Sequence, residues 1–100
     1  MMPKPQTEFV VATSFRLPGL GLLVLPLSPA PTWLVDYALH TAISVTLLIE
    51  AQHPISLIGT IEELARDGQP AQRAILLDFV PKDLLAAGAR IEISDEQPMP

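Results

Sequence analysis

The sequence predicts an all-β fold, either a barrel or a sandwich, with six strands and no long helix. Turn signals rich in proline, glycine and aspartate recur about every eight to fifteen residues, a spacing typical of all-β domains. Between them lie short segments rich in β-branched and aromatic residues, which favour strands. We expect one domain over residues 8–94, with flexible tails at 1–7 and 95–100 that carry prolines and few apolar residues.

The first strand is expected over Phe9–Leu17, because this segment is rich in β-branched and aromatic residues. Pro18–Gly21 is a turn, since proline fixes φ and glycine accepts positive φ. Leu22–Leu25 follows as a short, continuous apolar run, which predicts a strand covered on both faces. The proline-rich segment Pro26–Thr32 is a loop.

The segment Trp33–Leu39 is ambiguous between a loop and a single helical turn with Thr32 as its N-cap. It holds the only tryptophan and the only tyrosine of the chain, Trp33 and Tyr37. Aromatic residues beside a loop can anchor a protein partner, so Trp33, Leu34 and Tyr37 are the candidate partner-binding residues. The alternative is that these side chains cap the open end of a small core.

The clearest strand is Ala42–Glu50. Its alternation places four aliphatic residues on one face, namely Ile43, Val45, Leu47 and Ile49. A turn is expected at Ala51–Pro54.

Two interpretations compete for Ile55–Leu64. Thr60 and Glu63 match a capping box, which would begin a short helix that ends at Gly68. The β-rich run "ISLIGTI" instead favours a strand, although a strand turns Glu62 and Glu63 toward opposite faces. We favour the strand.

The remaining elements complete the sheet. Arg66–Gln72 is expected to be a turn, Arg73–Val80 a strand, and Pro81–Gly88 a single helical turn. Ala89–Ser94 is the last strand, with Ile91 and Ile93 facing inward.

Leu17–Val35 contains no charged residue and is long enough to cross a bilayer. Its four prolines, at positions 18, 26, 29 and 31, argue against a membrane helix. A secretory signal is an alternative, with Arg16 before the apolar run and Ser28–Ala30 as the cleavage zone. Glu8 ahead of Arg16 and a turn near the start of the run favour a buried hairpin and a cytoplasmic protein.

The composition is unusually poor in charge. Apolar residues make up 49% of the chain and charged residues 17%, whereas about 25% is usual. Such a surface favours self-association or a protein partner. The net charge of −5 repels phosphate backbones, so nucleic-acid partners are not expected. The absence of cysteine excludes disulfides and thiolate metal sites.

Motifs for catalysis are missing from the sequence. The two histidines, His40 and His53, have no metal-binding spacing. No serine lies in a G-x-S-x-G elbow, and "GLG" at Gly19–Gly21 lacks the third glycine of a dinucleotide site. We therefore predict no enzyme activity and no catalytic, cofactor-binding or metal-binding residue. The carboxylates of Glu62, Glu63, Asp67 and Asp78 are interpreted as a solvated rim.

The stretch "FVVATSFRLPGLGLLVLP" resembles the entry to the second domain of elongation factor Tu and related translational GTPases. In that family a strand ends in a short apolar–Pro/Ser–Gly–x–Gly turn, and an apolar strand follows. Phe15, Leu17, Gly19 and Gly21 stand at the matching places. The stretch "GTIEELARDGQPAQRAILLDFVPKDLLAAGARI" is similar to the later half of that domain, where the matching residues are Gly59, Ile61, Glu62, Leu76, Leu77, Asp83, Leu84 and Gly88.

The resemblance implies a small, closed, six-stranded β-barrel and supports the strand at Ile55–Leu64. The sequence also departs from the family. It has no GTPase domain, and "PLSPAPTWLVDYALH" replaces the compact hairpin of the family and has no counterpart there. The family's barrel helps to hold the aminoacyl end of tRNA, but no basic groove is evident in this sequence.

Three functions follow as hypotheses. The favoured one is a non-enzymatic module for protein binding or self-assembly. The alternative is a translation-linked accessory that contacts the ribosome, tRNA or a translation factor, which requires the six cations to converge: Lys4, Arg16, Arg66, Arg73, Lys82 and Arg90. The third, a small enzyme or ligand carrier, requires a deep pocket that holds His40 or His53 beside a carboxylate.

Overall fold

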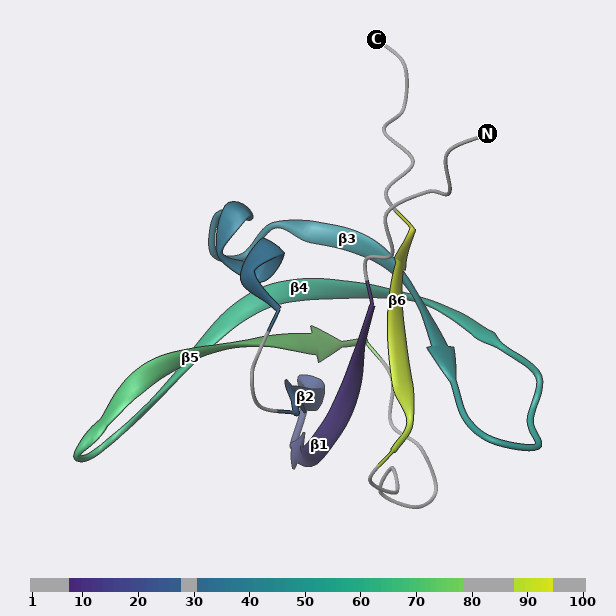
Figure 1. Ribbon diagram of the computed structural model, residues 1–100, viewed down its shortest axis with the longest axis horizontal. Helices are drawn as coiled ribbons and strands as arrows, with labels where there is room; N and C mark the ends of the chain where they lie inside the picture. The colour runs from purple at the N-terminus through teal and green to yellow at the C-terminus, as the bar shows by residue number, and fades with distance from the viewer. Residues whose placement is uncertain (1–7, 28–30, 79–87, 95–100) are drawn as a thin grey trace, which may run out of the picture.

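The computed structural model describes residues 8–27, 31–78 and 88–94. These residues form six strands and one short 3-10 helix (Figure 1). The elements are β1 (Glu8–Leu17), β2 (Gly21–Pro26), η1 (Thr32–Asp36), β3 (Ala42–Leu48), β4 (Ile55–Arg66), β5 (Gln69–Leu77) and β6 (Arg90–Ser94).

All strand pairs are antiparallel, and the hydrogen-bonded order is β1-β2-β5-β4-β3-β6. The order closes on itself, because Phe9 of β1 pairs with Ile91 of β6. The all-β prediction is therefore confirmed, and six strands are linked in a ring. The interpretation of Ile55–Leu64 as a strand is also confirmed, and the capping-box alternative is wrong: Thr60 and Glu63 both lie within β4.

The uncharged stretch that begins at Leu17 contributes a tight hairpin, as expected. The Leu20 N–H donates a hydrogen bond to the Leu17 carbonyl at 2.9 Å, and Gly19 adopts φ 79°. Proline followed by a glycine of positive φ at the two central positions is the pattern of a type II turn. Pro18, Gly19 and Leu20 thus join β1 to β2, with Leu17 opposite Gly21.

The main core fills the inside of the ring. Along the strands its members occupy every second position, as period-two patterning requires. Ile91 and Ile93 face inward, as predicted. The buried residues of this core are Phe9, Val11, Leu22, Val24, Leu34, Val45, Leu47, Ile61, Ile75, Leu77, Ala89, Ile91 and Ile93.

A second, smaller cluster lies on the outer side of β2. Leu23, Leu25 and Ala74 are buried there, and Leu17, Leu64 and Leu76 pack against them. Every residue of β2 is therefore buried, which confirms the expectation that this strand is covered on both faces.

A bulge in β1 changes which of its side chains face the core. Val11 pairs with Pro26 and Thr13 with Leu25, so Ala12 is the extra residue. Phe9 and Val11 face inward before the bulge. After it, Ser14 faces inward opposite Val24 of the main core, and Phe15 faces outward.

The turn predicted at Arg66–Gln72 is much shorter in the structure. Arg66 pairs with Gln69, so only Asp67 and Gly68 form the turn, with φ 75° at Gly68. The reason is that Asp-Gly is itself a strong hairpin signal. As a result, β5 begins at Gln69, four residues earlier than predicted. The β4–β5 hairpin extends away from the ring (Figure 1).

Two other expectations concern the irregular segments. Thr32 is not the N-cap of η1, because the cap is Pro31, whose carbonyl accepts a hydrogen bond from the Leu34 N–H at 3.3 Å. The end of the predicted strand at Phe79 and Val80, the helical turn at 81–87 and the tails at 1–7 and 95–100 lie outside the described residues.

Candidate functional site

The three predicted partner-binding residues lie on and just after η1. Leu34 is fully buried in the main core, and Trp33 and Tyr37 are partly buried against it. The Trp33 ring lies 6.3 Å from the Phe9 ring and 6.4 Å from the Tyr37 ring, measured between centroids. This packing fits the alternative in which η1 caps the core. Binding of a partner by Trp33 and Tyr37 stays a prediction, whereas Leu34 is covered in this structure.

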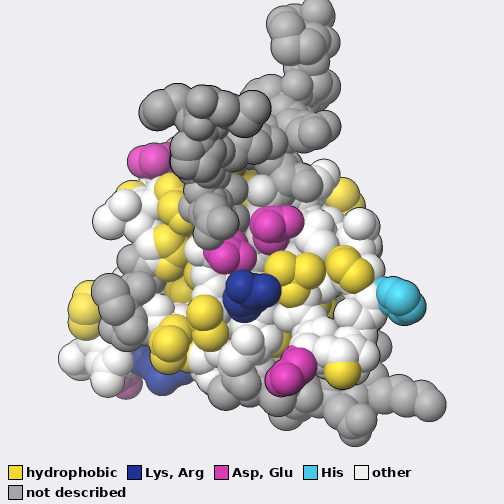
Figure 2. All heavy atoms as spheres, turned by 45° about the vertical axis from the view of Figure 1, so that its right-hand side comes forward, with side chains coloured by type: hydrophobic (Ala, Val, Ile, Leu, Met, Phe, Trp, Pro, Cys, Tyr) yellow, Lys and Arg dark blue, Asp and Glu magenta, His cyan; other side chains and the backbone are white. Residues whose placement is uncertain are grey.

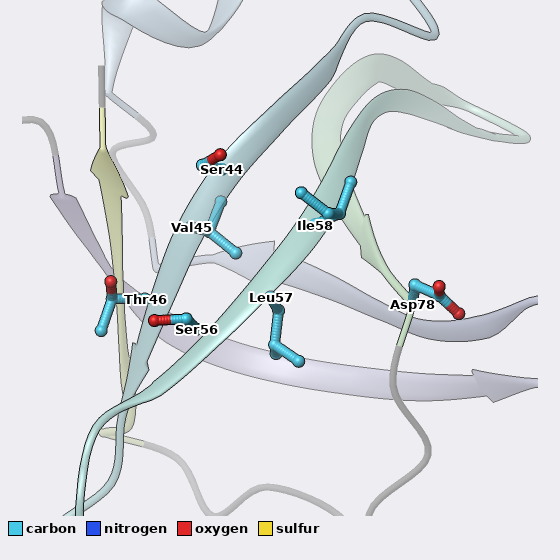
Figure 3. A pocket seen from close by; sticks show the side chains of 7 residues that line it. All are labelled: Ser44, Val45, Thr46, Ser56, Leu57, Ile58 and Asp78. Carbon is cyan, nitrogen blue, oxygen red and sulfur yellow. The ribbon is translucent and has the colours of Figure 1, made fainter. Parts of the chain in front are cut away.

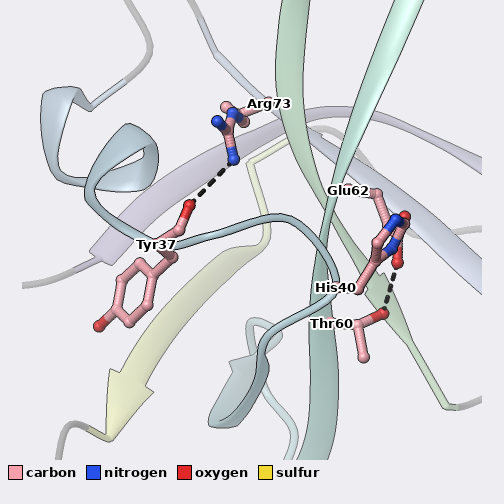
Figure 4. Close-up of polar contacts among 5 residues, drawn as sticks. All are labelled: Tyr37, His40, Thr60, Glu62 and Arg73. Carbon is pink, nitrogen blue, oxygen red and sulfur yellow. Dashed lines mark hydrogen bonds and ion pairs between the residues drawn. The ribbon is translucent and has the colours of Figure 1, made fainter.

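Arg73 of β5 holds the segment after η1 in place. Its Nη1 donates a hydrogen bond to the Tyr37 carbonyl at 3.0 Å, as Figure 4 shows. Its Nε lies 3.8 Å from a carboxylate oxygen of Glu63, the residue directly opposite it on β4. Glu63 lies two residues after the buried Ile61, so its side chain is on the inner face of β4, at the end of the core. The nearby Arg73 guanidinium balances the charge of the Glu63 carboxylate.

His40 and Glu62 form a polar cluster at the start of β3. His40 Nδ1 lies 3.1 Å from Glu62 Oε1, and Thr60 Oγ1 donates a hydrogen bond to Glu62 Oε2 at 3.0 Å (Figure 4). His40 adopts φ 70°, and its N–H donates to the Ile61 carbonyl. The His40 side chain is 75% exposed and that of Glu62 24%, so the imidazole side of the pair faces solvent.

Sequence reasoning missed this pair for a geometric reason. Ala42 lies opposite Thr60 on β4, so continuing the same register places His40 opposite Glu62. The alternation of β3 and β4 is visible in the sequence, but their register is not, because the connection between them is not a two-residue turn that would determine it.

The β1–β2 hairpin, with its turn and the residue that follows it, exposes four large apolar side chains. Val10 is 36% exposed, Phe15 40%, Leu20 62% and Leu27 53%. Val10 and Leu27 are adjacent, because the Leu27 N–H donates to the Val10 carbonyl at 2.7 Å. We call Val10, Phe15, Leu20 and Leu27 the hairpin face. Beside it, the Arg66 guanidinium lies 5.9 Å from the centre of the Phe15 ring.

Charged side chains are sparse on the described surface. On the face drawn in Figure 2, hydrophobic side chains form several groups and charged ones are few. The four described arginines lie on four strands, β1, β4, β5 and β6. Arg73 pairs with Glu63, and Arg90 lies 3.8 Å from Glu8, so acidic residues lie close to two of them.

Two of the hollows on the surface are lined by described residues. One, of about 470 Å³, lies between β3 and β4 next to Asp78 (Figure 3). The other, of about 310 Å³, is lined mainly by residues 48–52 with Gly88 and Arg90. Neither is lined by His40 or His53. The pocket required by the enzyme or ligand-carrier hypothesis is not formed by these two hollows.

Metal-binding clusters and membrane-spanning helices are both absent from the described residues. No three histidine, cysteine, aspartate or glutamate side chains are grouped so that they could hold a metal ion. In the same part of the chain, no helix has the length and apolar character needed to span a membrane.

Comparison with known proteins identifies no relatives: no family model, curated protein or solved structure matches this chain.

Proposed function

We propose that the chain is a non-enzymatic assembly module that binds a second copy of itself through the hairpin face. The observation that carries this proposal is the exposure of four large apolar side chains on one hairpin. An apolar group of this kind on a small domain is typical of an interaction surface. The low charge content of the whole chain supports the same conclusion.

The scarcity of charged residues in the hairpin favours a second copy of the chain as the partner. Arg16 is the only charged residue between Val10 and Leu27. It lies opposite Leu22, whose side chain is in the main core, so Arg16 projects toward the side away from Phe15. In a two-fold dimer the same surface meets itself. The hairpin face consists of apolar side chains, with the Arg66 guanidinium beside Phe15, and this allows the contact although each chain carries a net charge of −5.

The finer description of the fold belongs to the same proposal. The ring is a closed barrel, similar to the second domain of elongation factor Tu and its relatives. The supporting features are the antiparallel order of the six strands and the turn at Pro18 and Gly19. Closure pairs the strands on both sides along most of their length, which favours assembly through side chains of the outer surface.

The proposed module acts in the cytoplasm, because the apolar stretch after Arg16 supplies strand β2 of the ring and most of η1. The translation-linked alternative is supported less well. It requires a basic surface for RNA, whereas the described arginines lie on four different strands and acidic residues accompany Arg73 and Arg90.

Sedimentation velocity tests the proposal. The purified full chain is measured between about 1 and about 100 µM, the range for a contact of micromolar affinity. We expect a dimer, and we expect Leu27→Asp to shift the chain to monomer because it places a charge in the contact. Val35→Asp is the matched control, since Val35 is exposed on η1 and lies outside the hairpin face.

Circular dichroism verifies that both variants remain folded. A wild-type chain that stays monomeric over the whole range contradicts the proposal. Equal dissociation by both aspartate variants contradicts the assignment of the contact to the hairpin face.

A further inference from the structure

The hollow of about 470 Å³ next to Asp78 lies where the backbone pairing between β4 and β5 ends. β5 pairs with β4 as far as Leu77, opposite Gly59, and the Asp78 N–H donates a last hydrogen bond to the Ile58 carbonyl at 3.1 Å. β4 begins at Ile55. Its first four residues therefore pair with β3 on one side, and no described strand pairs with them on the other.

The alternation of an antiparallel strand shows which backbone groups face this open side. The N–H and C=O of one residue point to the same neighbouring strand, and those of the next residue point the other way. The Ile58 carbonyl points toward β5, so the N–H and C=O of Ser56 and the N–H of Ile58 point the same way. Among the described residues these three groups have no backbone partner.

The side chains around this edge are hydroxyls, aliphatic groups and one carboxylate. Ser44 and Thr46 of β3 lie opposite Ile58 and Ser56 of β4, and Asp78 stands at the end of β5 (Figure 3). The volume of about 470 Å³ is in the range of sites that hold a short peptide or a small molecule. Among the described residues of the lining Asp78 is the only charged one, and no described cation forms an ion pair with it.

We propose that the edge of β4 at Ser56–Ile58 binds an extended basic peptide. The peptide backbone adds to β4 through the Ser56 and Ile58 groups that have no partner among the described residues, and a lysine or arginine side chain meets the Asp78 carboxylate. This site lies on β4 and does not depend on the hairpin face.

The probe is a blocked six-residue peptide that alternates lysine and valine, titrated into the ¹⁵N-labelled full chain by NMR. We expect the largest amide shifts at Ser56, Ile58 and Asp78. A peptide with glutamate in place of lysine is expected not to bind. A peptide methylated on alternate backbone nitrogens is expected to lose binding, because methylation removes the donors that strand pairing needs.

Two substitutions in the protein separate the backbone and charge contributions. Ser56→Pro removes the N–H that faces the open side and keeps the ladder to β3, so we expect binding to be lost. Asp78→Asn is expected to weaken binding about threefold to fivefold, the effect of a solvent-exposed ion pair. Asp67→Asn makes the same change of charge at the distant β4–β5 turn and is expected to leave binding unchanged.

Three results would overturn this inference. They are the absence of shifts at the β4 edge, equal weakening by Asp78→Asn and Asp67→Asn, and undiminished binding of the N-methylated peptide. Equal weakening would mean that the acidic chain attracts a basic peptide without a defined site. Leu27→Asp, which disrupts the proposed dimer contact, is expected to leave this binding intact.

Discussion

Gly59 lies where β4 and β5 approach closely inside the ring. A Cβ atom at this position would be 2.7 Å from Ile75 Cγ2 and 3.5 Å from the Leu76 carbonyl oxygen. The first distance is shorter than any normal carbon–carbon contact, and the branched Ile75 side chain has few alternative rotamers. Glycine is therefore required here by space and not by backbone conformation.

Gly59→Ala is expected to lower the free energy of unfolding by about 1 kcal/mol or more. Overpacking costs about 1–3 kcal/mol, which outweighs the gain of about 0.4–1 kcal/mol from a less flexible unfolded chain. Urea denaturation measures the change. Ile75→Leu removes the obstructing Cγ2 branch, so the double variant is expected to be more stable than the two single effects predict. Strict additivity would contradict the assigned contact.

Ser14 presents a buried hydroxyl to the core. Its side chain is buried, and its Oγ has no hydrogen-bond partner in the described part of the chain. An unsatisfied buried polar group costs about 1–3 kcal/mol. The bulge at Ala12 explains this position, because without it Ser14 would face outward.

Ser14→Ala is expected to leave the free energy of unfolding unchanged or to raise it by up to about 1 kcal/mol, since it removes a group that is desolvated without compensation. Ser44→Ala, at an exposed position of β3, is the control and is expected to change stability by less than about 0.5 kcal/mol. Urea denaturation measures the change. If Ser14→Ala lowers the free energy of unfolding by more than about 1 kcal/mol, the Ser14 hydroxyl has a hydrogen-bond partner in solution.

At the scale of elements, η1 acts as the cap at one end of the core. Leu34 inserts into the main core, Trp33 stacks beside Phe9, and Arg73 holds the Tyr37 carbonyl. A helix of one or two turns has little intrinsic stability. Its conformation therefore depends on these contacts with the strands.

Leu34→Ala is expected to lower the free energy of unfolding by about 2–5 kcal/mol, the usual cost of truncating a fully buried leucine. Val35→Ala is the neighbouring control, expected to cost less than about 0.5 kcal/mol because Val35 is exposed. If the two variants have the same stability in urea, η1 does not cap the core in solution.

At the scale of the whole molecule, the net charge opposes the association of two copies, whereas the hairpin face favours it. Each chain carries a net charge of −5, so two copies repel one another at long range, whereas the apolar contact is short-ranged. Salt screens the electrostatic repulsion between the two copies. The Debye length falls from about 30 Å at 10 mM salt to about 3 Å at 1 M.

We therefore expect the dimer to become tighter as the salt concentration rises, which sedimentation equilibrium at about 10 mM and about 1 M sodium chloride will measure. Binding of the basic peptide to β4 is expected to weaken over the same range, because attraction between opposite charges is also screened. Dissociation of the dimer at high salt would instead indicate an interface that depends on ion pairs.

Several local features could be predicted from the residues alone. The turn at Pro18 and Gly19, the double burial of β2 and the strand over Ile55–Leu64 follow from conformational preferences of neighbouring residues. The candidate site was predicted less well. Leu34 was expected at a binding surface but lies in the core, and His40 was not expected to pair with Glu62.

The sequence by itself determined that the segments between the turns form strands and that their side chains alternate between two faces. Both properties depend on backbone sterics and on spacing over a few residues. The tertiary structure alone decided where the alternation is interrupted and which distant strands pair. The bulge at Ala12 turns Ser14 inward and Phe15 outward, and the pairing of β1 with β6 joins residues about eighty positions apart. Such choices depend on partners distant in the chain, so no local pattern contains them.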